Sequence, residues 1–172
     1  MKAEHEESFR CFAEAAMPRL RRLAFASCRD PHRADDLVQS TLEKMYAAWP
    51  RVERVEDPGA YARTVLVRTL ISEQRRRWWR AETSSADPHG EAGGSSVALA
   101  AEAVETRLVV AEALARLPER QRLVVVLRFL EDLSVAAVAE LLGCSEGTVK
   151  STSHDAVKAL RVSLDFFAGQ RV

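Results

Sequence analysis

Residues 133–161 constrain the fold of this chain more than any other part of its sequence. Ser134 is a favoured helix N-cap, because its hydroxyl can accept a hydrogen bond from an amide of the first turn. Gly143 suits the left-handed conformation that follows a helix, and Ser145 can cap a second helix. Residues suited to packing recur at helical spacing in both segments: Val135, Val138, Ala139 and Leu142, then Val149, Ser153, Ala156, Val157 and Leu160. The pattern predicts two helices that pack around a tight turn.

This pattern is typical of a helix-turn-helix, whose second helix enters the major groove of DNA. The polar residues left over on the second predicted helix are of types that reach phosphates and base edges: Lys150, Ser151, Thr152, His154, Asp155 and Lys158. We expect this face to lack the Glu/Lys ladder that an ordinary solvated helix tends to carry. A pair of helices that merely pack together stays open as the alternative, since caps and turns occur in any helical protein.

Charge is distributed unevenly along the chain, although its formal net charge is zero. Residues 1–80 hold 16 basic and 12 acidic residues, and residues 107–172 hold 9 and 8. Between them, residues 81–106 hold five acidic residues, no Lys or Arg, and a run rich in Ser, Gly and Pro. This composition is typical of a flexible linker. The sequence therefore predicts an N-terminal domain over residues 1–82, an acidic linker over 83–103 and a C-terminal domain over 104–172.

Composition excludes several other classes of protein. Only 7 glycines and 6 prolines in 172 residues, with many Ala, Leu, Glu and Arg, favour an all-α fold. We expect a cytoplasmic protein, since no apolar run nears the roughly 18 residues of a membrane span and the N-terminus lacks the apolar core of a signal peptide. Cys11, Cys28 and Cys144 are far apart in the sequence, which predicts three small core residues in a reducing cytoplasm rather than metal ligands or disulfides. No nucleophile-base pair or phosphate-binding loop stands out, so we expect no enzyme and no cofactor.

The N-terminal block predicts three helices, over about residues 6–27, 31–49 and 59–81. Asp30 and Asp57 each precede a proline, a combination that starts helices, and Pro50 is expected to end the second one. An acidic-polar stripe on the second helix is a plausible docking patch for a basic protein surface: Asp35, Asp36, Gln39 and Glu43. The third helix ends in RRRWWR, which either snorkels as an amphipathic tail or binds unstacked nucleic acid.

Two further helices are expected before the helix-turn-helix. The first covers about residues 104–116, and Leu117-Pro118 separates it from the second, PERQRLVVVLRFLED. In that second helix the expected core residues are Leu123, Val124, Leu127 and Leu130. These two helices and the helix-turn-helix would complete a four-helix C-terminal domain.

Four segments, taken together in this order, resemble the extracytoplasmic-function class of bacterial sigma factors. They are ADDLVQ at 34–39, SEQRRR at 72–77, LPERQR at 117–122 and GTVKS at 147–151. The resemblance covers roughly residues 8–165. It implies a promoter-recognition subunit of RNA polymerase that has no catalytic activity of its own.

The resemblance also implies roles for individual residues. The clamp of the largest polymerase subunit would be bound by Asp35, Asp36, Leu37, Gln39 and Glu43. The −10 promoter element would be melted and held by Arg51, Arg54, Tyr61, Arg63, Arg68, Ser72, Arg75, Arg76, Trp78 and Trp79. The −35 element would be read as duplex by Arg120, Thr148, Lys150, Ser151, Thr152, His154, Asp155 and Lys158. Further implied partners are the flap of the polymerase beta subunit and an anti-sigma factor, with the acidic linker lying in the RNA-exit path.

Some residues depart from the pattern of the family. Arg68 and Ser72 stand where relatives usually carry Asn and Asp, and Tyr61 replaces a frequent Trp. Asp155 occupies a position that is often basic, where it could accept from a cytosine amino group or simply repel phosphate. The alternative function is a stand-alone helix-turn-helix regulator that acts without polymerase.

Overall fold

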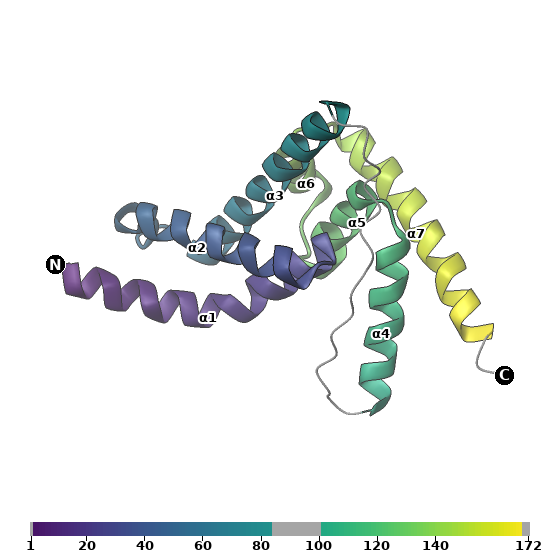
Figure 1. Cartoon of the computed structure of the whole chain (residues 1–172), viewed down its shortest axis with the longest axis horizontal. Helices are drawn as coiled ribbons and strands as arrows, with labels where there is room; N and C mark the ends of the chain where they lie inside the picture. The colour runs from purple at the N-terminus through teal and green to yellow at the C-terminus, as the bar shows by residue number, and fades with distance from the viewer. Residues whose placement is uncertain (1, 84–100, 170–172) are drawn as a thin grey trace. The chain divides into compact units, whose positions relative to one another are not determined.

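The computed structural model describes residues 2–83 and 101–169, and every regular element within these ranges is a helix (Figure 1). Three long helices come first: α1 (Lys2–Cys28), α2 (Pro31–Val52) and α3 (Pro58–Thr83). After the gap come α4 (Ala101–Arg116), α5 (Glu119–Val125), a π-helix (Val126–Leu130), α6 (Val135–Leu142) and α7 (Glu146–Gly169). The all-α prediction is confirmed. None of the described helices is long and apolar enough to cross a membrane.

The chain divides into two compact units, one built mainly from α1 to α3 and the other from α4 to α7. Most of the predicted linker, residues 83–103, lies outside the described residues. The prediction placed the start of the fourth helix at residue 104, whereas α4 begins at Ala101.

The first unit is held together by the packing of α2 against α3. The largest fully buried side chains in this unit are Leu23, Leu37, Met45, Leu66 and Leu70. Two polar contacts also join these helices. Lys44 Nζ donates to Thr69 Oγ1 at 2.7 Å, and Arg33 Nε lies 3.9 Å from Glu73 Oε2.

Both predicted aspartate caps are confirmed in the first unit. Asp30 Oδ1 accepts from the amide of Arg33 at 3.1 Å, and Asp57 Oδ1 accepts from the amide of Ala60 at 2.8 Å. Each bond satisfies an amide that has no partner within its helix.

The prediction that Pro50 ends the second helix is wrong, because α2 continues through it to Val52. A proline at this position removes a single amide, the one that would donate to the carbonyl of Tyr46. Both Tyr46 and Pro50 are exposed, so water can reach that carbonyl. The next bond of the helical series is present, since the amide of Glu53 donates to the carbonyl of Trp49 at 2.9 Å.

The second unit contains the predicted helix-turn-helix, α6 and α7. Ser134 Oγ accepts from the amide of Ala137 and Ser145 Oγ accepts from the amide of Thr148, both at 3.1 Å. Gly143 has φ 63° and ψ 41°, which is the left-handed conformation. Val138 of α6 and Val149 of α7 are completely buried, and α6 packs against α7. Ala156 of α7 is also completely buried, but it packs with Leu117 and Val125. Both caps and the glycine turn are therefore confirmed.

The side chain of Arg122 closes the C-terminal end of α4. Its Nη1 donates to the carbonyls of Leu114, Ala115 and Leu117 at 3.5, 3.3 and 3.4 Å. The last carbonyls of a helix have no partner within it, so a buried guanidinium from α5 satisfies them.

The fifth helix departs from its predicted geometry at Val126, where a π-helix begins. The amide of Glu131 donates to the carbonyl of Val126 at 3.0 Å, five residues back, which is the π pattern. The wider turn shifts the register of the residues within it. Leu130 is consequently 45% exposed, so its assignment to the core is wrong, while Leu123, Val124 and Leu127 are buried as predicted.

We predict that Gly143→Ala lowers the free energy of unfolding by about 1 to 2 kcal/mol, because a Cβ disfavours the left-handed conformation. No atom lies within 4 Å of a Cβ built there, so the loss is conformational rather than steric. Urea unfolding of the full chain, followed by circular dichroism, measures it.

Gly147→Ala is the matched control, because Gly147 lies within α7 and its Cβ would meet Ser145 Oγ at an ordinary 3.6 Å. Alanine favours a helix over glycine, so this change should raise stability by up to about 1 kcal/mol. Equal effects of the two substitutions would contradict the turn geometry.

Candidate functional sites

The predicted acidic-polar stripe lies on the exposed side of α2. Asp35, Asp36, Gln39 and Glu43 are all exposed, and their spacing places them within one sector of the helix. Asp35 Oδ1 accepts from Arg21 Nε of α1 at 3.1 Å. Gln39 Nε2 donates to Glu43 Oε1 at the same distance, and the described residues offer Asp36 no partner.

Leu37 lies in the same segment but on the opposite side of the helix. Its side chain is completely buried, so the prediction that it contacts a partner is corrected: Leu37 belongs to the core that supports the stripe.

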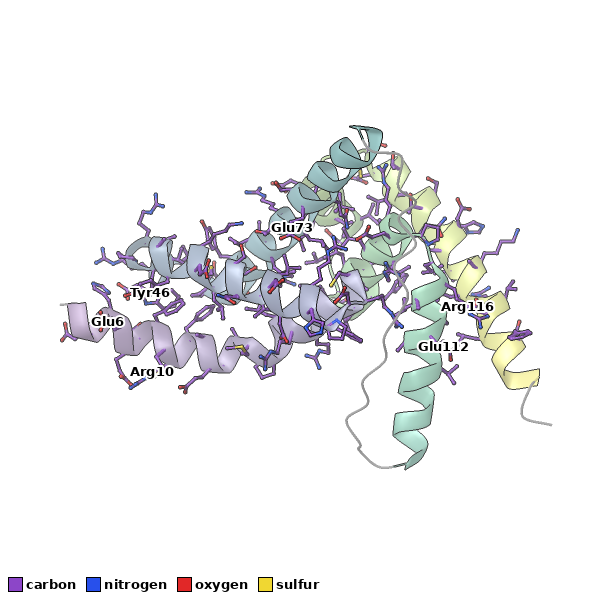
Figure 2. All side chains as sticks on the ribbon, in the orientation of Figure 1. Glu6, Arg10, Tyr46, Glu73, Glu112 and Arg116 are labelled. Carbon is purple, nitrogen blue, oxygen red and sulfur yellow. The ribbon has the colours of Figure 1, made fainter. Side chains whose placement is uncertain are left out.

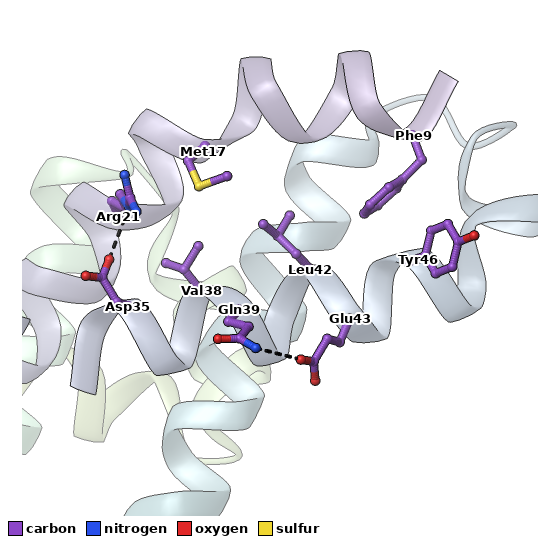
Figure 3. A pocket seen from close by; sticks show the side chains of 9 residues that line it. All are labelled: Phe9, Met17, Arg21, Asp35, Val38, Gln39, Leu42, Glu43 and Tyr46. Atoms are coloured by element: carbon purple, nitrogen blue, oxygen red, sulfur yellow. Dashed lines mark hydrogen bonds and ion pairs between the residues drawn. The ribbon is translucent and has the colours of Figure 1, made fainter. Parts of the chain in front are cut away.

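An open cavity of about 610 Å³ runs between α1 and α2, beside this stripe (Figure 3). Val38 and Leu42 of α2 and Met17 of α1 point into it, and the Arg21–Asp35 pair closes one end of the cavity. We call this cavity the α1/α2 groove; its lining residues are Phe9, Met17, Arg21, Asp35, Val38, Gln39, Leu42, Glu43 and Tyr46. The groove therefore combines an apolar floor with a polar rim that includes three residues of the predicted stripe.

Aromatic side chains form the other end of the groove. The ring of Phe9 packs edge-on against Tyr46 and Trp49, with centroid distances of 5.1 and 5.3 Å. Trp49 is buried and its Nε1 donates to Ser8 Oγ at 3.3 Å. Tyr46 is 50% exposed. Figure 2 labels its side chain on α2. Rings in such edge-on pairs attract one another beyond simple burial. Trp49 thus fixes the aromatic cluster to the core, and Tyr46 is the part of the cluster that faces solvent.

Sequence reasoning missed the part of this groove that α1 contributes. Phe9 and Met17 look like ordinary core residues of an amphipathic helix, and nothing in the sequence indicates which residues of α2 they face. The sequence does indicate the α2 side of the groove, because Asp35, Leu42 and Tyr46 recur at spacings of seven and four residues and so share one face of the helix.

The predicted −10 surface is only partly assembled on the described residues. Tyr61, Arg68 and Ser72 recur at i, i+7 and i+11 and therefore share one face of α3, with Tyr61 and Arg68 exposed. Arg63 lies on another side of α3 and is half-buried. Exposed Arg51 and Arg54 lie at the end of α2 and in the loop after it. The side chains of Arg75, Arg76, Trp78 and Trp79 lie outside the described residues.

The predicted −35 surface lies mainly on α7. Exposed on this helix are Lys150, Ser151, His154, Asp155 and Lys158, whereas Thr148 and Thr152 are half-buried. Arg120 is exposed on the first turn of α5.

Several polar side chains at the start of α7 bind within the helix. Thr148 Oγ1 lies 2.9 Å from Ser145 Oγ, and Ser151 Oγ donates to the carbonyl of Thr148 at 3.1 Å. Lys150 Nζ lies 3.6 Å from Glu146 Oε2, one turn earlier. One Glu/Lys pair at i,i+4 is therefore present at the start of α7, whereas the expectation was that this face lacks a ladder of such pairs.

No group of three or more potential metal-ligating side chains occurs in the described part of the chain. The three candidate surfaces, on α2, α3 and α7, offer hydrogen-bonding and charged groups on helix faces, which is the chemistry of macromolecular recognition.

Comparisons with known proteins match both units. Residues 12–80 match the family model Sigma-70 region 2, and residues 107–160 match Sigma-70, region 4. The RNA polymerase sigma-E factor of Streptomyces coelicolor is 37% identical over 161 residues, covering 94% of this chain and 86% of that protein. The ECF RNA polymerase sigma factor SigL of Mycobacterium tuberculosis is 36% identical over 165 residues, covering 88% and 91%.

Among solved structures, the chain is similar to the sigma factor RpoE from Bartonella quintana, crystallised in complex with the anti-sigma factor NepR. The TM-score is 0.71 at 25% sequence identity, and the match covers 91% of this chain and 96% of that one.

We predict different roles in stability for Tyr46 and Trp49, the two aromatic residues of α2 that pack against Phe9. Trp49→Ala should lower the free energy of unfolding by about 3 to 5 kcal/mol, because it empties a buried site. Tyr46→Ala should cost about 1 kcal/mol, since half of its side chain is already in water and mainly the contact with Phe9 is lost. Urea unfolding of both variants measures the difference, and losses of equal size would place Tyr46 in the core.

Proposed function

The chain belongs to the sigma-70 family, within its extracytoplasmic-function class, and on this premise we propose that it binds core RNA polymerase and directs transcription initiation at specific promoters. The observation that carries the proposal is the match of both units, one to region 2 and the other to region 4. A stand-alone helix-turn-helix regulator is not favoured, because it would need neither region 2 nor the acidic stripe on α2. A polymerase subunit works where the chromosome is, so we propose a cytoplasmic location.

The α1/α2 groove and its acidic stripe are proposed to receive a helix from the clamp of the largest polymerase subunit. A partner helix that presents apolar residues to Leu42 and Tyr46 would bury their exposed parts, above the already buried Val38. Basic side chains beside that apolar ridge would face Asp36 and Glu43, which are exposed. Complementary charge of this kind sets the orientation and partner choice of an interface more than its raw affinity.

Promoter DNA is proposed to be shared between the units. The face of α3 that carries Tyr61, Arg68 and Ser72 would hold the melted −10 element, together with the arginines and tryptophans at residues 75–79. Taking bases out of the stack costs a few kcal/mol per base, which stacking on aromatic rings partly returns. The α7 surface and Arg120 would hold the −35 element as duplex, because an α-helix fits the major groove.

Polymerase supplies the binding energy that this chain lacks. Release of counterions by basic residues is the main source of non-specific affinity for DNA, and the chain has 25 basic against 25 acidic residues. We therefore expect weak binding to DNA in the absence of polymerase. The acidic linker is proposed to lie in the RNA-exit path, with the flap of the beta subunit and an anti-sigma factor as further partners.

We predict that Asp36→Arg abolishes binding to core polymerase while the fold survives, since Asp36 is exposed and breaks no contact among the described residues when replaced. Pull-down with core polymerase measures binding, and thermal unfolding by circular dichroism checks the fold. Run-off transcription on a promoter library should show initiation with the unchanged chain and none with the variant.

Glu14→Arg is the matched control, because Glu14 is also exposed in the first unit but does not line the groove. It should bind polymerase as the unchanged chain does. Two results would overturn the proposal: unchanged binding by Asp36→Arg, or a purified chain that retards promoter duplex tightly without polymerase, as a stand-alone regulator would.

We predict that Lys150→Ala weakens binding of the holoenzyme to promoter duplexes of all sequences and reduces the slope of log K against log salt by about one. These are the effects of losing one phosphate contact. Fluorescence anisotropy over a range of salt concentrations measures both quantities.

Glu146→Gln should act in the opposite direction, because it removes the carboxylate that holds Lys150 Nζ at 3.6 Å. A loss confined to one base pair would instead identify Lys150 as a base-reading residue.

A further inference from the structure

One line of side chains occupies the middle of the outward surface of α7. Ser151, Asp155 and Lys158 follow one another at i, i+4 and i+7, which places them on one face of a helix. The completely buried Val149 and Ala156 lie on the opposite side. Because all three outward residues are exposed, Asp155 lies at the centre of the helix surface that a DNA groove would meet.

Asp155 differs from Lys150 and Ser151, which already bind other groups of α7. Lys150 pairs with Glu146, and the hydroxyl of Ser151 donates to the carbonyl of Thr148. Among the described residues, Asp155 has no hydrogen-bond or ion-pair partner, although Lys158 follows it by three residues. Its carboxylate oxygens are therefore available as acceptors for a ligand of this face.

An acidic residue on such a face must find a donor in the groove or weaken binding. A carboxylate near the edge of the face would meet phosphates, and like charges repel. At the centre of the face it meets base edges, where the donors are the amino groups of cytosine and adenine. Adenine places its N7 acceptor beside the amino group, which repels a carboxylate, whereas cytosine carries a C–H there. Guanine and thymine present only acceptors or a methyl group.

We infer that Asp155 is a specificity-determining residue that selects cytosine at one position of the duplex element bound by α7. The inference rests on the proposed function and adds the base that this chain prefers. Basic and neutral donors around it, Lys150, His154, Lys158 and Arg161, can contact the backbone on either side. The opposing possibility is that Asp155 only repels phosphate, which would weaken binding to every sequence alike.

The test uses the full chain with core polymerase on a promoter library in which each base pair of the upstream duplex element is varied in turn. Initiation is measured as run-off RNA. With the unchanged chain, one position should favour cytosine over the other bases by roughly five- to a hundredfold, the range for a good base contact. Asp155→Ala should remove the preference at that position alone. Asp155→Asn should move it to adenine, since an amide bonds both N6 and N7 of that base.

Asp165→Asn is the matched control, because it removes the same charge from the same helix about 15 Å farther along. It should leave every base preference unchanged. The inference is overturned if Asp155→Ala raises initiation equally on all templates, or if the cytosine preference is absent or survives the substitution. If the unchanged chain stimulates core polymerase on no template, the proposed function itself fails.

Discussion

The rotation of α2 about its own axis is the constraint on which the first unit depends. Leu37, Thr41 and Met45 are completely buried, and burial of such a stripe fixes which side of a helix faces the core. Asp35, Asp36 and Gln39 are then obliged to face outward, because residues one or two positions apart point to different sides. The packing of the core thus determines which charged side chains of α2 are exposed to a binding partner. The same logic holds in α7, where buried Val149 and Ala156 direct Ser151, Asp155 and Lys158 outward.

Contacts between exposed side chains modify what these faces can offer. The stripe on α2 carries three acidic residues, but Asp35 already pairs with Arg21, so Asp36 and Glu43 remain to attract a basic partner. Exposed ion pairs contribute little to stability, and this pair can be exchanged for a pair with another protein at low cost. On α7 the Lys150–Glu146 pair has a similar role, which leaves Asp155 and Lys158 as the uncommitted charges of the central line.

Local chemistry was readable from the sequence, and long-range geometry was not. Ser134, Gly143 and Ser145 were predicted correctly because a cap depends on residues within one helical turn. The prediction for Pro50 failed because the general rule against proline inside helices does not consider where in the helix the proline lies. Near the exposed C-terminal end of α2, the one backbone hydrogen bond that Pro50 removes is replaced by water at little cost in free energy. The α1/α2 groove could not be predicted, since it depends on which side chains of α1 face α2. Leu130 was misassigned because an ideal helical period was extended through a π turn.

The π-helix at Val126–Leu130 has a consequence for α7, the helix proposed to bind promoter DNA. Its hydrogen bond spans five residues instead of the four of an α-helical turn, so the segment contains one additional residue. One residue corresponds to about 100° of rotation around a helix axis. Deleting a single residue there would restore regular winding but would send the chain into α6 from a different direction. The direction of α7 relative to the rest of the second unit therefore depends on residues 126–130, which precede the helix-turn-helix. These residues contact no nucleic acid in the proposed mechanism.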